Sequence, residues 1–195
     1  MEFKDYQKYR WFYTSSGKLV VGGKNSEQNE TLIRKMKEMK MDFLAMHTTS
    51  PGSPFSIILA DSKLVKESDR EECAIFTASF SKAWKEEKKK TSVDIFNLSQ
   101  LYKLKHMKQG TWGVKGEITR ISAHVELVLT KQNNKLRAVP PITVKSDKDI
   151  LLKIIPGGKL DKNLIFPKIQ IAIEESFSKE DFLSAMPAGG IKIKK

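Results

Sequence analysis

Apolar and polar positions divide the first hundred residues into short strands and two helices. Residues 9–22 predict an aromatic strand and an aliphatic strand joined by a Ser-Ser-Gly turn. Residues 42–47 predict another strand, and the apolar run at 55–60 is typical of a strand buried on both faces. A further strand is predicted at 92–98.

The first helix is predicted from about Ser26 to Lys40, with Asn25 or Ser26 as its cap. Gln28 follows Asn25 by three residues, much as in a capping box. The apolar residues recur every three or four positions and so share one face, formed by Leu32, Ile33, Met36 and Met39.

The second helix is predicted to begin at Ser68 or Asp69, where Ser68 and Glu71 have the spacing of a capping box. We expect it to continue through "SFSKAW" and to end in the basic run 85–90, which suits the negative end of the helix dipole. Its apolar face is expected to contain Cys73, Phe76, Phe80, Ala83 and Trp84.

From residue 121 onward the pattern is mainly that of strands, predicted at 121–130, 135–144 and 149–158. A helix then begins near Asp161 or around Pro167, and a short capped helix at 178–186 precedes a basic final strand at 187–195. The sequence thus predicts an α+β fold: a mixed, mostly antiparallel sheet with two main helices and a β-rich C-terminal extension. We divide it into a core at 1–120 and an extension at 121–195 that packs on the core.

Composition narrows the class of protein. A chain of 195 residues with 39% hydrophobic and 30% charged residues is typical of a globular protein. Its single cysteine, Cys73, has the helical spacing of a core residue and excludes an internal disulfide. No apolar run has the roughly 20 residues needed to cross a bilayer, and no signal peptide is visible, so we expect a cytoplasmic protein with no membrane partner. The net charge of +12 favours polyanionic partners.

Catalytic and metal-binding patterns are few. His47, His106 and His124 are far apart and lack the spacing of a zinc site, so we expect no metal ion and no cofactor. The chain contains no Walker A, GxSxG or GxGxxG motif. The sequence therefore favours a binding protein over an enzyme.

The segment 20–35 is the best candidate for a ligand site. Gly22 and Gly23 end an apolar strand, and a helix begins directly after them. The free backbone N–H groups of a helix start attract phosphate, and Lys24 adds a positive charge. The same residues can equally form a tight turn whose polar side chains, Asn25, Gln28 and Asn29, only cap the helix.

Aromatic and basic residues elsewhere could extend such a site. Arg10 and Trp11 lie in an aromatic strand whose rings cannot all face the core, and an exposed ring could stack on an unpaired base. Lys103 and Lys105 would share one face of a strand and could follow a phosphate backbone. On the second helix, the candidates are the basic Lys82, the aromatic Trp84 and the neighbouring Ser81.

Several of these segments together resemble a known family. The stretch "FYTSSGKLVVGGKNSEQNETL", followed by "DFLAMHTTSPGS", "FTASFSKAW", "SVDIF" and "LYKLK", is similar to the NFACT-R domain. This domain is the RNA-binding module of the NFACT proteins of ribosome-associated quality control, and it also occurs as a standalone protein. The segments "IIPGG" and "MPAGGIKI" are similar to C-terminal extensions of archaeal members.

The resemblance implies an RNA site at residues that match the family pattern, and these are Gly22, Gly23, Lys24, Asn25, Gln28, Asn29, His47, Gly52, Ser53, Ser81, Lys82 and Trp84. Pro54 stands where family members often have a histidine. Implied partners are tRNA or ribosomal RNA, the large ribosomal subunit, and a separately encoded NFACT N-terminal half.

Three functional hypotheses follow. The first is a non-enzymatic RNA-binding module in translation quality control. The second is an RNA-processing or RNA-modifying enzyme with a pocket at the glycine turn, in which His47 and Asp42 act as acid–base residues. The third is a protein adaptor on the ribosome whose positive charge serves docking to ribosomal RNA.

Overall fold

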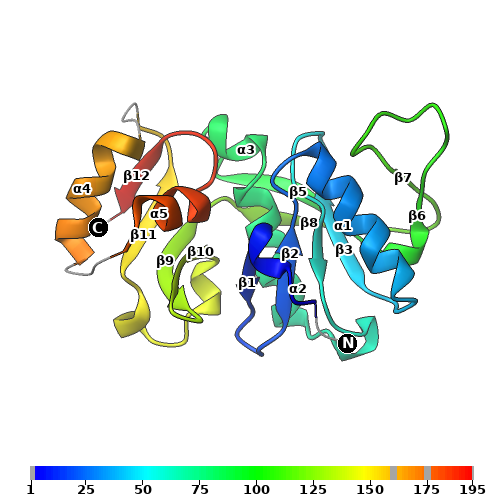
Figure 1. The fold of residues 1–195 in the computed structure, drawn as a ribbon, viewed down its shortest axis with the longest axis horizontal. Helices are drawn as coiled ribbons and strands as arrows, with labels where there is room; N and C mark the ends of the chain where they lie inside the picture. The colour runs from blue at the N-terminus through cyan, green and yellow to red at the C-terminus, as the bar shows by residue number, and fades with distance from the viewer. Residues whose placement is uncertain (1–2, 159–161, 174–176, 195) are drawn as a thin grey trace.

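Two antiparallel sheets lie side by side along the long axis of the molecule (Figure 1). The computed structural model describes residues 3–158, 162–173 and 177–194. Helices cover both sheets, and the predicted α+β fold is confirmed. Within the described residues, all the strand pairs are antiparallel, so the sheets are not mixed.

The larger sheet has six strands in the order β1-β2-β4-β3-β5-β8. Two of its strand pairs, β1–β2 and β3–β4, are hairpins of consecutive strands, and in the first of them Trp11 lies opposite Val21. The strands are β1 (Arg10–Tyr13), β2 (Leu19–Gly22), β3 (Leu44–Thr48), β4 (Ser56–Ile58), β5 (Lys90–Asn97) and β8 (Thr119–His124).

Each face of this sheet is covered by one 13-residue helix, α1 (Ser26–Glu38) or α2 (Glu67–Ser79). Side chains alternate across a strand, so neighbouring residues of β2 enter different cores. Val21 packs with the apolar face of α1, whereas Val20 packs with α2. The predicted apolar residues Leu32, Ile33 and Met36 are buried as expected.

The second sheet has four strands in the order β10-β9-β11-β12, and two helices pack near it. Its elements are β9 (Leu127–Gln132), β10 (Lys135–Val139), β11 (Leu152–Pro156), β12 (Ile191–Lys194), α4 (Lys162–Ile173) and α5 (Lys179–Ala185). Asn133 and Asn134 both have positive φ (50° and 57°), which gives β9 and β10 the twisted two-residue turn of a hairpin.

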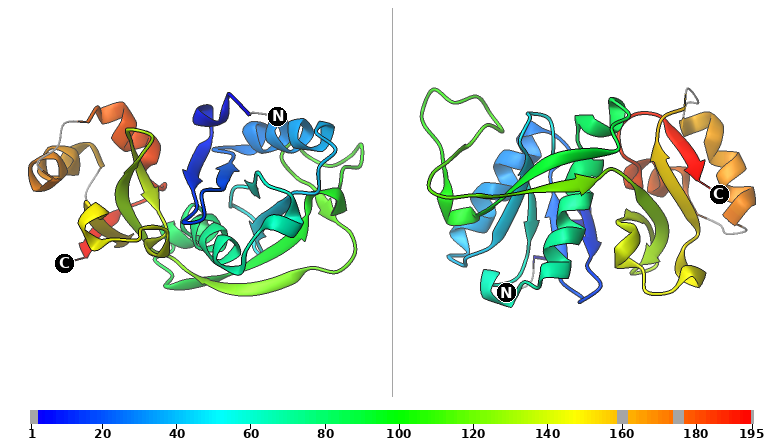
Figure 2. Two further views of the ribbon diagram at one scale, coloured as in Figure 1. Left: turned by 90° about the horizontal axis from the view of Figure 1, so that it is seen from below. Right: turned by 180° about the vertical axis from the view of Figure 1, so that it is seen from behind.

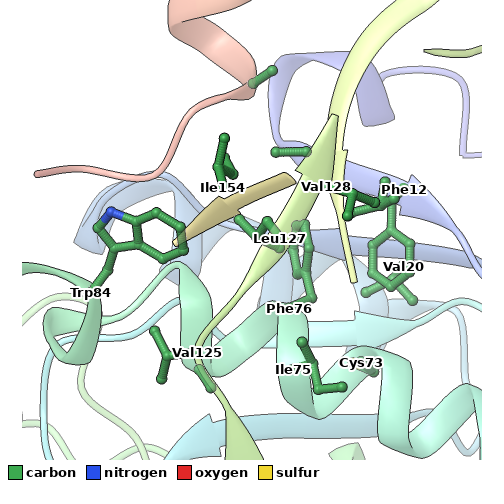
Figure 3. Packing of buried hydrophobic residues seen from close by; sticks show 14 of the residues in the cluster. Phe12, Val20, Cys73, Ile75, Phe76, Trp84, Val125, Leu127, Val128 and Ile154 are labelled. Carbon is green, nitrogen blue, oxygen red and sulfur yellow. The ribbon is translucent and has the colours of Figure 1, made fainter. Parts of the chain in front are cut away.

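One apolar cluster runs from α2 into the second sheet. Phe76 of α2 lies near Leu127 and Val128 of β9, with Ile154 of β11 beyond them (Figure 3). Trp84 belongs to the same cluster and donates a hydrogen bond from Nε1 to the carbonyl of Gly190 at 2.8 Å. The C-terminal strands therefore share an apolar cluster with α2.

A two-stranded arm, residues 101–114, extends from the six-stranded sheet at the end far from the C-terminal sheet (Figure 2). It consists of β6 (Leu101–Tyr102) and β7 (Gly113–Val114) with a long loop between them. The remaining short elements are α3 (Lys82–Lys85) and the 3-10 helices η1 (Tyr6–Lys8), η2 (Ser62–Leu64), η3 (Leu98–Gln100), η4 (Pro141–Thr143) and η5 (Asp147–Asp149).

The second predicted helix differs from the observed one at both ends. The predicted capping box of Ser68 and Glu71 is not the cap of α2. Asp69 caps the helix instead, because its carboxylate accepts a hydrogen bond from the backbone N–H of Lys66 at 2.9 Å. The helix ends at Ser79. Ser81 then starts α3, since its hydroxyl accepts a hydrogen bond from the N–H of Ala83. The expected single helix is therefore two helices.

Two C-terminal predictions also need correction. The predicted strand 121–130 is broken at residues 125–126, so that β8 belongs to the first sheet and β9 to the second. Pro167 lies inside α4 and not in its first turn. The alternative start, Asp161, lies outside the described residues and directly precedes α4. A division of the chain near residue 120 stays a proposal, and the sheets part about five residues later.

Candidate nucleic-acid interface

A cavity of about 580 Å³ opens where β2 turns into α1, and we call it the junction cavity. Its walls come from the start of α1, from the end of β3 with the β3–β4 loop, and from the arm. Strands β1 and β5 and the end of α2 complete it with Arg10, Phe80, Asp94 and Phe96. The cavity brings together these residues of the predicted site: Arg10, Gly23, Lys24, Asn25, Asn29, His47, Gly52 and Ser53.

The start of α1 has side-chain caps and also has backbone N–H groups without a partner among the described residues. The side chain of Asn25 accepts a hydrogen bond from the N–H of Gln28 at 2.8 Å, and the side chain of Gln28 accepts one from the N–H of Lys24 at 3.0 Å. The backbone N–H groups of Asn25, Ser26 and Glu27 have no partner among the described residues. These donors and the positive end of the helix dipole form a site suited to an anion. The caps predicted by the sequence are therefore formed, and the free amides leave the anion-binding alternative as a prediction.

Gly23 is required by a close contact. A Cβ atom on Gly23 would lie 2.2 Å from Oδ1 of Asn29 and 2.7 Å from its backbone nitrogen. That Oδ1 accepts a hydrogen bond from the N–H of Phe55 at 3.2 Å and so connects α1 to the start of β4. Gly22, still in β2, is less tightly enclosed, since its Cβ would lie 3.2 Å from the Pro54 side chain.

Two cations line the cavity. The guanidinium of Arg10 lies over the ring of Phe80, 4.8 Å from its centre. Burial lowers the pKa of Arg10 to about 10, so this side chain stays charged at pH 7. Burial, and then the nearby charges of Arg10 and Arg137, also lower the pKa of Lys24. Neither Arg10 nor Lys24 has a carboxylate partner among the described residues, so their charge is available to an anionic ligand.

His47 contributes a neutral imidazole. Its Nδ1 lies 2.6 Å from the carbonyl oxygen of Thr48, and this contact assigns the proton to Nδ1 and leaves Nε2 as an acceptor. Burial lowers the pKa of His47, and its ring packs on Phe55 with 4.5 Å between centres. Asp94 lies opposite His47 on the neighbouring strand β5, and its carboxylate forms a salt bridge with Arg120 at 2.6 Å.

Glu30 holds the arm over the start of α1. Its Oε2 accepts hydrogen bonds from Nζ of Lys103 at 2.7 Å and from the N–H of Gly110 at 3.0 Å. Its Oε1 accepts one from Arg34 at 3.0 Å. Burial acts to raise the pKa of Glu30, but these donors outweigh burial and lower it. Through this carboxylate the arm brings Trp112 to the cavity wall.

Several predicted site residues lie elsewhere. Trp11 is 2% exposed and lies beneath the guanidinium of Arg137, so the expectation of an exposed ring is wrong. Trp84 is fully buried, and the Ser81 hydroxyl caps α3. Gln28 lies outside the cavity wall, as does Lys82, whose exposed side chain packs against Gly52 at the cavity rim.

The predicted strand bearing Lys103 and Lys105 is absent. Strand β6 ends at Tyr102, and both lysines belong to the arm loop. Lys103 is paired with Glu30, so the two side chains do not form the expected track. The surface near the cavity instead offers Lys82 as an exposed cation.

The candidate acid–base pair of His47 and Asp42 is not assembled. Asp42 lies before β3 and His47 near its end, which separates their Cα atoms by roughly 16 Å at the usual rise per residue. Asp42 accepts a hydrogen bond from the hydroxyl of Ser62 and does not line the junction cavity. Within the described residues, no group of three or more His, Cys, Asp or Glu side chains is placed to hold a metal ion.

Sequence reasoning missed the contribution of the arm. Gln109, Gly110, Thr111 and Trp112 line the cavity although they are far from the glycine turn in sequence. Trp112, which stands beside Gly113 in an otherwise polar segment, is the feature of the sequence that could have indicated an aromatic side chain at a binding site. Its position over α1 depends on long-range contacts of Glu30, which local patterns do not reveal.

Comparison with known proteins identifies the family. Residues 8–116 match the model of the NFACT protein RNA binding domain. The chain belongs to this family. The match covers strands β1 to β5 of the six-stranded sheet, both long helices and the whole arm, and it ends before β8.

A similar sequence and a similar solved structure extend the comparison. An archaeal Rqc2 homolog, aRqcH, of Methanocaldococcus jannaschii is 29% identical over an alignment that covers all of this chain and 30% of that protein. The chain thus spans under a third of that relative. The C-terminal part of a fibronectin/fibrinogen-binding protein from Streptococcus suis has the same fold, with a TM-score of 0.53 at 23% identity, over 60% of this chain and 45% of that one. No helix among the described residues is long and apolar enough to cross a membrane.

Proposed function

We propose that this chain is an RNA-binding module that acts in ribosome quality control, with the junction cavity and its rim as the contact site. Membership of the NFACT RNA-binding domain family and the similarity to an archaeal Rqc2 homolog support this role. The observation that carries it is the start of α1, where free amides, Lys24 and Arg10 converge without an acidic partner among the described residues.

The proposed RNA is tRNA or ribosomal RNA, met in the cytoplasm on the large ribosomal subunit. A separately encoded NFACT N-terminal half is a further proposed partner. The net charge of +12 favours such an anionic surface. Treating extracts with RNase before a pull-down distinguishes direct RNA contact from a protein adaptor, since an adaptor keeps its protein partners after treatment.

The test is binding of labelled tRNA and single-stranded RNA, followed by fluorescence anisotropy over a range of salt. Binding to phosphates releases counterions, so log K should fall with log[salt] by about 0.7 per single-strand phosphate contacted. The variant Lys24→Ala/Lys82→Ala should bind all sequences at least tenfold more weakly, with a shallower slope.

The control is Lys145→Ala/Lys148→Ala, which removes the same charge from exposed lysines near the second sheet. Equal losses in both double variants would show that only net charge matters. A wild-type affinity that does not change with salt would contradict the proposal altogether.

One observation keeps a catalytic alternative open for testing. His47 is neutral, lines the cavity and has Nε2 free as an acceptor, which a general base requires. Total tRNA incubated with the protein should then show cleavage or a mass change that His47→Ala abolishes. Unchanged RNA with both proteins leaves the binding function as the better account.

A further inference from the structure

We propose that the junction cavity receives the base of one unpaired nucleotide, whose phosphate lies on the start of α1. This inference rests on the RNA-binding function proposed above and names the ligand more closely. The cavity has two halves, one suited to an anion and the other to a flat ring with polar edges.

The anionic half is the start of α1. The amides of Asn25, Ser26 and Glu27 are free, and Lys24 and Arg10 line the same space. The space that a Cβ on Gly23 would need is occupied by Asn29, so Gly23 allows this packing at the start of the helix. The free amides and the two cations are the groups that a phosphate would contact.

The other half is built from flat rings. His47, Phe55, Phe96 and Trp112 line the cavity, and His47 is already packed on Phe55. Two cations, from Arg34 and Lys103, lie over the Trp112 ring at 5.8 and 5.4 Å from its centre. Cationic groups near a ring and stacked aromatics are the surroundings in which proteins hold unpaired bases.

Polar groups in this half lack partners among the described residues. Asn29 is only 8% exposed, and its Oδ1 is used by Phe55 while Nδ2 has no partner. Nε1 of Trp112 is buried and also has none. Nε2 of His47 is a free acceptor. Of these three atoms, only Nε1 of Trp112 is fully buried. Nδ2 of Asn29 and Nε2 of His47 offer one donor and one acceptor, which suit a ligand that carries both kinds of group.

Size and shape restrict that ligand to an unpaired nucleotide. A volume of about 580 Å³ is within the range of small-molecule sites. A base within a duplex presents only its edge and stays stacked on its neighbours, so it cannot enter. A single strand, a bulge or a chain end can supply a base together with its phosphate.

The experiment is an abasic scan. A labelled six-nucleotide RNA is bound to the wild-type protein, and each base in turn is removed while its phosphate is kept. One position, and no other, should lower affinity about tenfold, as stacking of one base implies. Duplex RNA of the same length should bind as weakly as that abasic strand.

Two variants test where the base lies. In Trp112→Ala the sensitive position should disappear, because the intact and abasic strands then bind alike. Thr49→Phe, which fills the cavity from an exposed position on its wall, should give the same result without touching the core. Lys82→Ala, the matched control, should weaken all strands equally and keep the sensitive position.

The outcomes separate this inference from the proposed function. If no RNA binds with salt dependence, the proposed function fails. If RNA binds but every abasic position has the same effect, or both cavity variants keep the sensitive position, RNA binding stands and base insertion is wrong.

Discussion

Gly23 and Asn29 form a contact on which both the start of α1 and the site depend. The Asn29 side chain occupies the space that a Cβ of Gly23 would need, and its Oδ1 accepts a hydrogen bond from the N–H of Phe55. Phe55 in turn supports His47 in the cavity wall. One small residue therefore sets the distance between the phosphate half of the cavity and the ring half.

Gly23→Ala is expected to lower both stability and RNA affinity. A Cβ 2.2 Å from Oδ1 and 2.7 Å from a backbone nitrogen cannot be accommodated without moving α1, and strain of this kind in a packed site costs about 1–3 kcal/mol. Urea unfolding and RNA anisotropy measure the two effects.

The neighbouring glycine is the control. Gly22→Ala places its Cβ 3.2 Å from Pro54 and 3.3 Å from Ser56, where a shift of a few tenths of an ångström relieves the contact. It should therefore cost clearly less. An equal loss of unfolding free energy in Gly22→Ala and Gly23→Ala would mean that the contact with Asn29 does not determine the effect at Gly23.

Individual residues near the glycines were predicted well where local chemistry decides. The caps at Asn25 and Gln28 are formed by neighbours within one turn, so spacing alone indicates them. Trp11 was misjudged because strand alternation gives two faces but not what covers them. Its outer face is covered by Arg137 of β10, more than a hundred residues later in the chain.

The arm is held by the carboxylate of Glu30 together with apolar packing at its base, where Leu101 is buried and Trp112 packs against the cluster beneath α1. Glu30 is 9% exposed and accepts hydrogen bonds from the arm through Lys103 and Gly110, while Arg34 of its own helix binds its other oxygen. Leu104, in the arm loop, is exposed. The position of Trp112 at the cavity is therefore sensitive to this one side chain.

Glu30→Gln is expected to loosen the arm. The amide nitrogen of glutamine must face either Arg34 or the two arm donors, and each arrangement opposes donor to donor. Hydrogen exchange of residues 103–112 should rise by tenfold or more, and affinity for single-stranded RNA should fall several-fold.

A substitution elsewhere in the arm checks that result. Lys105→Ala removes an exposed charge from the same loop but no contact of Glu30, so exchange should stay as in the wild type. Unchanged exchange in Glu30→Gln would contradict the role of Glu30 as the anchor.

Periodicity predicted most strands and helices but not their interruptions. The apolar spacing of Phe76, Phe80 and Trp84 continues through the break between α2 and α3, because all three side chains face a core. Likewise, alternation continues through Val125 although the chain changes sheets there. The positions of such breaks depend on which part of the molecule the following residues pack against. A window of ten residues does not contain this information.

Beside the apolar cluster that α2 shares with the second sheet, two buried carboxylates one turn apart on α2 connect the parts of the molecule. Asp69 accepts hydrogen bonds from Thr14 and Ser16 in the β1–β2 turn and pairs with Lys18. Glu72 accepts them from Ser15 and from Thr143, which follows the second sheet's β10. The first hairpin, α2 and the C-terminal part thus meet at this pair.

The two carboxylates should make opposite contributions to the pH dependence of stability. Burial acts to raise the pKa of Asp69, but the hydroxyl, amide and lysine donors lower it to about 2. Its stabilising effect is therefore present above the unfolded pKa of about 4 and is lost as the pH falls toward 2. Burial raises the pKa of Glu72 despite its donors, so its contribution is present at low pH and is lost as the pH rises.

Amide variants of this pair therefore separate the two effects. At pH 7, Asp69→Asn should lower the free energy of unfolding by about 2 kcal/mol, because a charge favoured by folding is removed. Glu72→Gln should leave it unchanged or raise it slightly, because its acceptors are largely kept while a charge disfavoured by folding is lost. Urea unfolding followed by tryptophan fluorescence between pH 3 and 7 measures both. The difference between wild type and Asp69→Asn should shrink as the pH falls below 4, and a constant difference would show that the Asp69 contacts stabilise by packing and not by charge.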